Sequence, residues 1–253
     1  MRKVSILVLL GLIALAASTQ ATTLIRQDLG EQIDQAELIF AGTVVHMETA
    51  VTAKDGFPFT FVTFEVERTL KGDFPRGGSL TLRFGGGETK DDQTIIHGIP
   101  RFALDGRHVL FVAGNGQGVC PLVGWSQGKL DLRRHPETGE EILTDNDGWP
   151  LIGFADGAWR RADSQLTRDG FWKQEEPGVA LVGSEGVEIS GLPAADRSRN
   201  FVDAPTVKQL LPALASQVAK RRAEPTFQAP KAVPQAKVSD LPASLLPTKG
   251  GAQ

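Results

Sequence analysis

Regular alternation of apolar and polar residues is the strongest pattern along this chain. Over residues 57–70, "FPFTFVTFEVERTL", successive side chains would point to opposite faces of a strand. The face with Val62, Phe64 and Val66 is expected to face the core. Similar patterns predict strands at 37–49, 79–84 and 107–115, a short edge segment at 94–102 that Pro100 interrupts, and two hairpins that pair 121–125 with 128–134 and 140–145 with 149–154.

Two stretches have the longer period of a helix. In residues 26–37, Leu29, Ile33 and Ala36 fall on one face, which predicts a short helix. A second, amphipathic helix is expected over 204–222, although an interior proline should disturb its hydrogen bonding. Its apolar face would consist of Val207, Leu210, Leu211, Leu214 and Val218, and the proline is Pro212.

These elements predict a mostly β protein. A short helix followed by several strands favours a small closed antiparallel barrel of the OB-fold type, because closure removes free strand edges. From 155 to 200 the pattern weakens, which predicts irregular structure. We expect a signal peptide at 1–21, an OB-fold-like barrel domain at 22–145, a β/irregular extension at 146–222 that ends in the C-terminal helix, and a disordered tail rich in Pro and Ala at 223–253.

The N-terminus has the pattern of an export signal. Arg2 and Lys3 precede an apolar run from Val4 to Ala17, and Ala21 offers a small residue at the cleavage position. The alternative of a membrane anchor is disfavoured, because a bilayer span needs about 20 apolar residues. We therefore expect an exported protein, periplasmic or extracellular, with no membrane span after cleavage.

The composition narrows the classes of partner and site that we expect for this protein. The chain has 27 basic and 30 acidic side chains, and cleavage of the signal would remove two of the basic ones. A nucleic-acid partner is not expected, because such a protein carries a basic surface. A single cysteine excludes an intramolecular disulfide and a zinc site built from several thiolates.

Four segments carry a family resemblance. In this order, "AELIFAGTVV" (36–45), "FVTFEVERTLKG" (61–72), "SLTLRF" (79–84) and "RHVLFVAGNG" (107–116) resemble the N-terminal domain of tissue inhibitors of metalloproteinases. That domain is an OB-fold barrel, shared with netrin-like modules. With "GIPRF" and "CPLVGWSQGKLDL", the run also resembles a group of uncharacterised exported bacterial proteins. The resemblance implies the same barrel here.

The resemblance does not extend to the inhibitory residue. The mature animal inhibitors begin with a cysteine that chelates the zinc of the target, whereas this mature chain would begin at Thr22. Zinc-chelating inhibition is therefore not carried over. We expect a non-enzymatic binding module that recognises another exported or surface protein, with an extracellular protease as one such partner. The alternatives are a carbohydrate or small-molecule binding protein, and a hydrolase with a site built from His97, Asp105 or His108.

The candidate binding residues lie in two turns. Pro100 stiffens "GIPRF" and presents Arg101 and Phe102, a pair suited to recognition. The alternative is that Phe102 caps the core and Arg101 is solvated. His97 precedes this turn, and Trp125 lies in the second turn, "VGWSQGK". We take these four residues as binding candidates and expect no catalytic residue, metal ligand or cofactor.

Two short motifs could bind a cation, and each also has a structural interpretation. His46 and Glu48 share a strand face, where they either bind a cation or are solvated. The segment "DNDGW" (145–149) is either a common turn or a calcium loop without its later Glu.

The cysteine and the late tryptophans also leave alternatives open. Cys120 lies in an apolar stretch with no activating neighbour, which favours core packing over an intermolecular bridge or a functional thiol. Trp149, Trp159 and Trp172 either pack the extension against the barrel or line a binding cleft.

Overall fold

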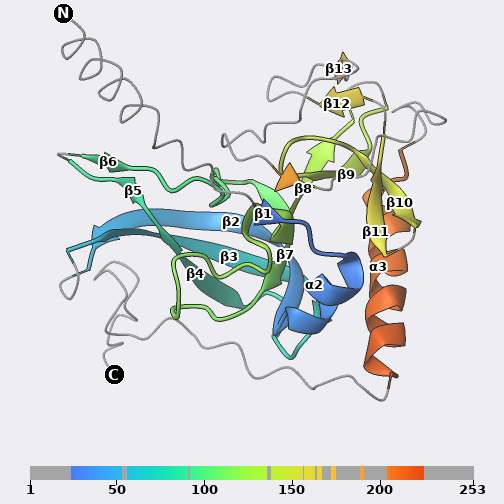
Figure 1. Ribbon diagram of the computed structural model, residues 1–253, viewed down its shortest axis with the longest axis horizontal. Coiled ribbons are helices and arrows are strands. Elements are labelled where there is room, and N and C mark those ends of the chain that lie inside the picture. The colour runs from blue at the N-terminus through green and yellow to red at the C-terminus, as the bar shows by residue number, and fades with distance from the viewer. Residues whose placement is uncertain are drawn as a thin grey trace, which may run out of the picture.

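The computed structural model describes residues 24–52, 56–90, 92–135, 138–155, 157–162, 164–166, 172–174, 189–190 and 204–224. Within these ranges the protein is mostly β, with one six-stranded antiparallel sheet and two helices (Figure 1). The sheet has the order β4-β3-β2-β7-β8-β9. Its strands are β2 (Leu38–Val51), β3 (Pro58–Lys71), β4 (Ser79–Gly85), β7 (Arg107–Val112), β8 (Lys129–Arg134) and β9 (Glu141–Asp145).

The remaining elements are short strands and the helices. Four two-stranded sheets pair β1 with β14, β5 with β6, β10 with β11 and β12 with β13. The strands are β1 (Leu24–Ile25), β5 (Gly87–Glu88), β6 (Gln93–Thr94), β10 (Leu151–Ala155), β11 (Ala158–Arg161), β12 (Ser164–Leu166), β13 (Trp172–Gln174) and β14 (Ile189–Ser190). The helices are α2 (Leu29–Gln35), the 3₁₀ helix η1 (Trp125–Gly128) and α3 (Val207–Arg222).

One side of the sheet faces an apolar cluster, the inner core, as the alternation predicted. Val62, Phe64 and Val66 are all fully buried there. Three register irregularities between β2 and β3 add local bends to this long strand pair. The inner core consists of Leu38, Phe40, Val44, Val62, Phe64, Val66, Leu80, Leu82, Phe84, Ile99, Leu110, Val112 and Leu122.

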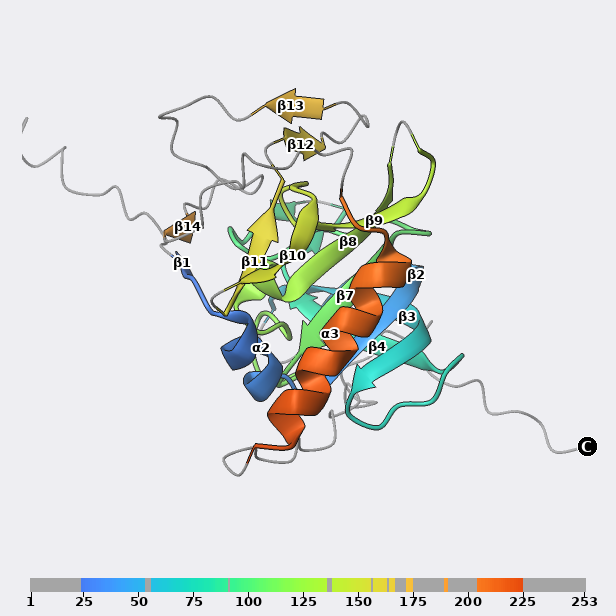
Figure 2. The same cartoon turned by 90° about the vertical axis from the view of Figure 1, so that its right-hand side faces the viewer.

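The other side of the sheet packs against the helices and forms the outer core. Ile39 and Ala41 point into it, while their neighbours on β2 point into the inner core. Figure 2 shows α3 lying across this side, with α2 and the β10–β11 hairpin beside it. The predicted apolar faces of both helices are confirmed, because every residue named for them is buried. The helical members are Leu29, Ile33, Ala36, Val207, Leu210, Leu211, Leu214 and Val218.

Helix α3 continues through its proline. Pro212 lies on the exposed face and removes one backbone donor, yet the helix extends ten residues beyond it. Thr206 and Gln209 form a capping box that satisfies backbone groups at the start. The capping box and the buried apolar face of α3 therefore compensate for the hydrogen bond that Pro212 removes.

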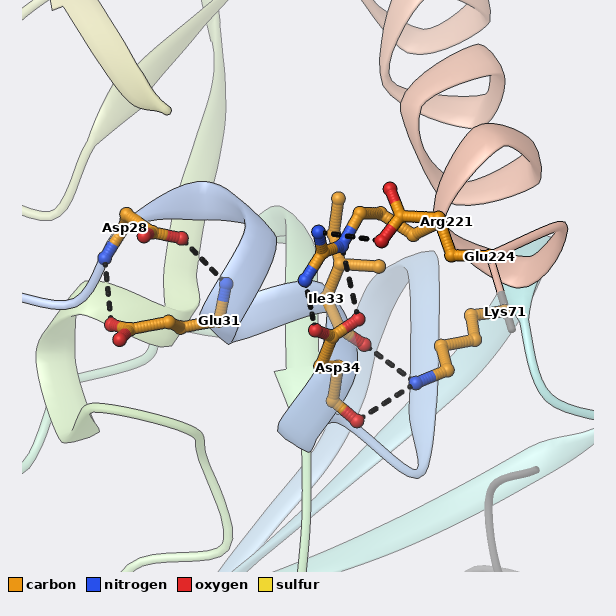
Figure 3. A network of polar contacts seen from close by, with 7 residues as sticks. All are labelled: Asp28, Glu31, Ile33, Asp34, Lys71, Arg221 and Glu224. Atoms are coloured by element: carbon orange, nitrogen blue, oxygen red, sulfur yellow. Dashed lines mark hydrogen bonds and ion pairs between the residues drawn. The ribbon is translucent and has the colours of Figure 1, made fainter. Parts of the chain in front are cut away.

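Helix α2 is shorter than predicted and is tied down at both ends (Figure 3). Asp28 caps its start by accepting a hydrogen bond from the Glu31 backbone at 2.6 Å, and Glu31 accepts one from the Asp28 backbone at 3.2 Å. At its end, the buried Lys71 ammonium of β3 donates to the carbonyls of Ile33 at 2.5 Å and Asp34 at 3.1 Å. These contacts join the helix to the sheet.

Of the two predicted hairpins, the first is wrong in its pairing and the second is confirmed only at its turn. The centre of the first is the helix η1, and Leu122 only bridges to Val112 at the end of β7. Strand β8 instead pairs with β7 and β9, which satisfies backbone groups on both of its edges. In the second, Thr144 bridges to Pro150, but β9 pairs with β8 and β10 pairs with β11. Of the predicted edge segment 94–102, only Thr94 lies in a strand.

The strand pairings described leave the sheet open, with β4 and β9 at its two ends. An irregular segment approaches the free edge of β4. The backbone of Gly85 donates to Val119 at 2.6 Å, and Asn115 bonds the backbones of Thr81 and Arg83. The closed barrel stays a prediction, and this segment is the part of the chain that favours it.

Several predictions lie outside the described residues. These include the signal peptide at 1–21 and, apart from two residues, the tail at 223–253. The described parts of 155–200 include β11 and the short paired strands β12, β13 and β14, so they are more regular than predicted. In the part of the chain that the structure describes, no helix is both long and apolar enough to cross a bilayer.

Candidate functional site

Three of the four candidate residues lie in one loop, residues 95–106. Backbone hydrogen bonds fix this loop near both ends. The amide of Asp105 donates to Val44 on β2 at 3.0 Å, and the amide of Ser126 in η1 donates to Gly98 at 3.1 Å. The loop is therefore held against both the sheet and the turn that carries the fourth candidate.

Arg101 and Phe102 follow a buried proline, Pro100, and differ in exposure. Arg101 is exposed, whereas Phe102 is half-buried. The ring of Phe102 lies 4.8 Å from that of Phe84 and 5.4 Å from that of Phe64, measured between centroids. Phe102 therefore caps the inner core, and Arg101 is presented to solvent beside it.

His97 and Trp125 occupy the two turns that meet next to this loop. His97 is exposed in a turn with Gly98. Trp125 has a φ of 58° and packs half-buried against the inner core. The hydrogen bond from Ser126 to Gly98 brings the turns together, but neither candidate lines the hollows beside Arg101.

Arg101 and Phe102 separate two hollows on the surface. On one side is the apolar groove, lined mainly by apolar side chains and by the glycines that follow β4. On the other is the polar cleft, lined by charged side chains of β7 and β8. The groove is lined by Met47, Val62, Phe84, Ile95, Ile96 and Ile99 among others, and the cleft by His108, Lys129, Asp131, Arg133, Asn146 and Asp147 among others.

A buried cluster of three ionisable groups forms one wall of the polar cleft. His108 and Asp131 are opposite each other on β7 and β8, and His108 Nδ1 lies 2.6 Å from Asp131 Oδ1. Lys129 Nζ lies 2.8 Å from the same oxygen. Phe102 covers the cluster, because its ring is 5.2 Å from that of His108 and 5.5 Å from Lys129 Nζ.

Burial and neighbouring charges together shift the pKa values of His108 and Asp131. Burial lowers the pKa of His108, an effect that Lys129 reinforces and the bond to Asp131 opposes. Burial also raises the pKa of Asp131, but Lys129 and His108 outweigh it and hold the pKa below its ordinary value. The cluster therefore holds a neutral imidazole beside a carboxylate–ammonium pair.

A neutral histidine beside a carboxylate has the form of a general base, so the hydrolase alternative needs a nucleophile. The described residues that line the cleft include no Ser, Thr or Cys. The other ring nitrogen, His108 Nε2, is buried without a described partner. The backbone of Gly106 approaches this nitrogen closely, because a Cβ at that position would lie 2.8 Å from it. This arrangement suits a buried structural pair better than a reactive one.

Lys129 and Asp131 were not among the sequence candidates. Their signal is nevertheless present in "KLDLRR", where Lys129, Asp131 and Arg133 alternate with leucines. Alternation places all three on one strand face, and that face lines the polar cleft. The sequence could not show that β8 is a central strand, which is what buries the first two.

Cys120 is half-buried against the inner core, as the sequence favoured. Burial raises the pKa of its thiol to about 12, although a backbone hydrogen bond from Leu122 opposes the shift. The thiolate is the reactive form of cysteine, so this thiol is a poor nucleophile at neutral pH.

The two candidate metal-binding motifs form an ion pair on a strand and a hydrogen-bonded turn. His46 Nε2 lies 3.6 Å from Glu48 Oε2 on the surface of β2. In "DNDGW", Asp145 accepts hydrogen bonds from the backbones of Asp147 at 3.0 Å and Trp149 at 2.9 Å, which is turn chemistry. No group of three His, Cys, Asp or Glu residues within the described ranges could hold a metal ion.

Searches with this chain against protein-family models, curated proteins and solved structures found no match. The fold and the site therefore carry the functional argument alone. Together they define a mostly β protein in which a fixed loop separates an apolar groove from a polar cleft.

Proposed function

We propose that this protein is an exported, non-enzymatic binding module that recognises another exported or surface protein through the loop 95–106. The observation that carries the proposal is the position of Arg101, an exposed cation on a fixed backbone between the apolar groove and the polar cleft. A rigid loop loses little conformational entropy on binding, which favours affinity. An extracellular protease is one partner of this kind.

Exposed apolar side chains around the loop support a protein partner. Leu104 is 61% exposed, Ile95 50% and Val45 46%, and these are large hydrophobic residues in a loop and at its edge. The hydrogen bond from Asp105 to Val44 joins the backbones next to Leu104 and Val45. A partner that covers these side chains and brings a carboxylate to Arg101 would match both features.

The six-stranded sheet is proposed to be part of an OB-fold-like, netrin-like barrel. The segment from Asn115 to Val119 is bonded to the free edge of β4, and the residues that follow it return to β7 through the bridge of Leu122 to Val112. This path would close the sheet through irregular backbone. The loop 95–106 would then lie at one end of the barrel.

Crosslinking capture tests the proposed function. The mature chain, residues 22–253, is immobilised and exposed to the exported fraction of its native organism, and retained proteins are identified by mass spectrometry. The double variant Arg101→Glu/Leu104→Asp is the test, and Lys208→Glu on the exposed face of α3 is the matched charge-reversal control.

We expect one partner that the wild type and Lys208→Glu retain and that the double variant loses. Equal capture by all three proteins would contradict the proposal, and so would the absence of any retained protein. In the second case a melting shift with oligosaccharides would favour the carbohydrate-binding alternative, and turnover of broad hydrolase substrates would favour the enzyme.

A further inference from the structure

A small polar cavity lies where the start of α2 meets the β10–β11 hairpin, and it shares Asn146 and Asp147 with the polar cleft. Figure 2 shows these elements side by side at the edge of the outer layer. The cavity has a volume of about 60 Å³. Its lining residues are Arg26, Gln27, Gln32, Ser126, Gln127, Leu130, Asp145, Asn146, Asp147, Leu151, Trp159 and Arg161.

Arg161 is the most deeply buried charge in this cavity, with 2% of its surface exposed. Its guanidinium stacks on Trp149, 4.8 Å from the ring centroid. Only Nη1 has a described partner, the Asp145 carboxylate at 3.4 Å, which is a long contact. Nε and Nη2 have none.

The two unpaired nitrogens form one edge of the guanidinium. Nε–H and Nη2–H point in the same direction, and such an edge accepts both oxygens of a carboxylate in two parallel hydrogen bonds. An arginine buried with this edge unpaired is unfavourable, because a buried donor without a partner keeps its full desolvation cost. The edge is thus a preformed fork without a protein acceptor.

Unpaired polar atoms gather in this cavity. Ten buried side-chain atoms of the described residues lack a hydrogen-bond partner, and five of them belong to residues that line it. They are Arg161 Nε, Arg161 Nη2, Trp159 Nε1, Gln27 Oε1 and Gln32 Oε1. The cavity therefore offers three donors and two acceptors, which is the pattern of a polar ligand site rather than of scattered packing defects.

Charged side chains of both signs line the cavity. A second guanidinium, Arg26, lines it, and burial lowers the pKa of Arg26, as does the nearby charge of Arg161. Two carboxylates oppose these cations: Asp147, and Asp145, whose pKa burial raises to about 6 despite Arg161. An anion between the two arginines would relieve their mutual repulsion.

We infer that this cavity binds the carboxylate group of a small organic acid, with its oxygens on the free edge of Arg161 and on the indole N–H of Trp159. The volume supports a group of this size, since it equals that of about two liquid water molecules. A hydroxyl next to the carboxylate would donate to Gln32 or Gln27. None of the residues that line the cavity belongs to the loop 95–106, although Ser126 donates a hydrogen bond to Gly98 of that loop.

Side-chain NMR of ¹⁵N-labelled protein tests the inference directly. Sodium acetate and sodium glycolate are the probes, at neutral pH, with sodium chloride as the ionic-strength control. We expect saturable shifts of the Arg161 Nε–H and Trp159 Nε1–H signals with both acids and none with chloride. Glycolate should bind about ten-fold more tightly than acetate, because its hydroxyl gains one hydrogen bond.

Three variants test whether the acids bind at the free edge of Arg161. Arg161→Lys keeps the charge beside Asp145 but removes the fork, and should abolish saturable binding. Trp159→Phe keeps the ring, assigns the indole signal and should weaken binding about ten-fold. Arg160→Lys, the neighbour on β11 that does not line the cavity, should bind as the wild type does.

Backbone amide spectra of each variant show whether it is folded. The inference is overturned if neither side-chain signal shifts saturably at millimolar acid, which would leave the cavity to water. It is also overturned if Arg161→Lys binds as tightly as the wild type. Equal affinity for acetate and glycolate would overturn the part assigned to the glutamines.

Discussion

Two buried cations flank helix α2, and their surroundings differ. Lys71 is 1% exposed and Arg161 is 2% exposed. The Lys71 ammonium donates to two carbonyls at the end of the helix, Ile33 and Asp34 (Figure 3). Arg161, near the start of the same helix, keeps two N–H groups unpaired. Equal burial thus accompanies a structural role in one case and an open binding edge in the other.

The difference teaches how a buried charge is to be judged. Helix ends leave carbonyl groups without intrahelical partners and carry partial negative charge, so a buried lysine there is stabilised twice. Burial lowers the pKa of Lys71 and the charge of Asp34 opposes this shift. For Arg161, the described compensation is one long contact to Asp145 and the stacking on Trp149, and neither pairs Nε or Nη2. The number of satisfied donors therefore distinguishes the two roles better than burial does.

The largest effect is expected for Lys71→Ala. The change removes two charge-assisted hydrogen bonds, leaves two carbonyls unpaired and opens a cavity, so we expect a loss of about 3 to 5 kcal/mol in the free energy of unfolding. Urea denaturation measures it. Lys208→Ala, on the exposed face of α3, is the control and should change stability little. A loss under about 1 kcal/mol for Lys71→Ala would contradict the structural role.

The next effect concerns Asp145 and depends on pH. Its pKa is about 6 in the folded protein against 3.8 for an unperturbed aspartate, so the folded state holds this proton more tightly than the unfolded chain. Stability from this group is fully present below about pH 4 and is lost as pH rises to about 6, a loss of about 2 to 3 kcal/mol.

Asp145→Asn removes this titration and keeps an acceptor for the two backbone donors. The difference in unfolding free energy between variant and wild type should therefore shift in favour of the variant by about 2 to 3 kcal/mol between pH 4 and pH 7. Denaturation at several pH values measures it. A difference that does not vary with pH would show that Arg161 neutralises Asp145 fully, and would weaken the case for an open edge.

The smallest effect is expected for the exposed ion pair of Arg221 with Asp34 (Figure 3). Arg221 also contacts Glu224 at 3.0 Å, and its side chain is 33% exposed. Arg221→Ala should cost less than about 1 kcal/mol, because water screens exposed pairs. The cost should shrink further in high salt. A loss as large as that of Lys71→Ala would contradict the ranking by burial and satisfied donors.

Local alternation predicted the strands of the sheet well, because apolar residues at every second position mark the strand face that is buried. Val62, Phe64 and Val66 could be placed from the segment 57–70 alone. Register could not be predicted in this way: β8 pairs with β7 and β9 rather than with the segment before it. That choice depends on which edges are free after the other strands have paired, and it is not a local property.

The candidate sites show the same limit. The exposed Arg101 beside Phe102 could be predicted, because Pro100 and the glycine mark a fixed turn. The sequence offered packing or a cleft as the role of Trp159, and the structure places it on a cavity wall. Arg161 was missed entirely, because its ion-pair partner Asp145 and its stacking partner Trp149 come from outside β11. Lys71 resembles an exposed strand-end lysine for the same reason.

The central claim is that the free edge of Arg161, unlike the satisfied Lys71, is a carboxylate site. It is tested most directly by the unfolding free energy as a function of sodium acetate at constant ionic strength. Wild type and Lys71→Ala should each gain about 1.4 kcal/mol for every ten-fold rise in acetate above the dissociation constant, while Arg161→Lys gains nothing. Equal gains in Arg161→Lys and the wild type, or no gain in either, would contradict the account.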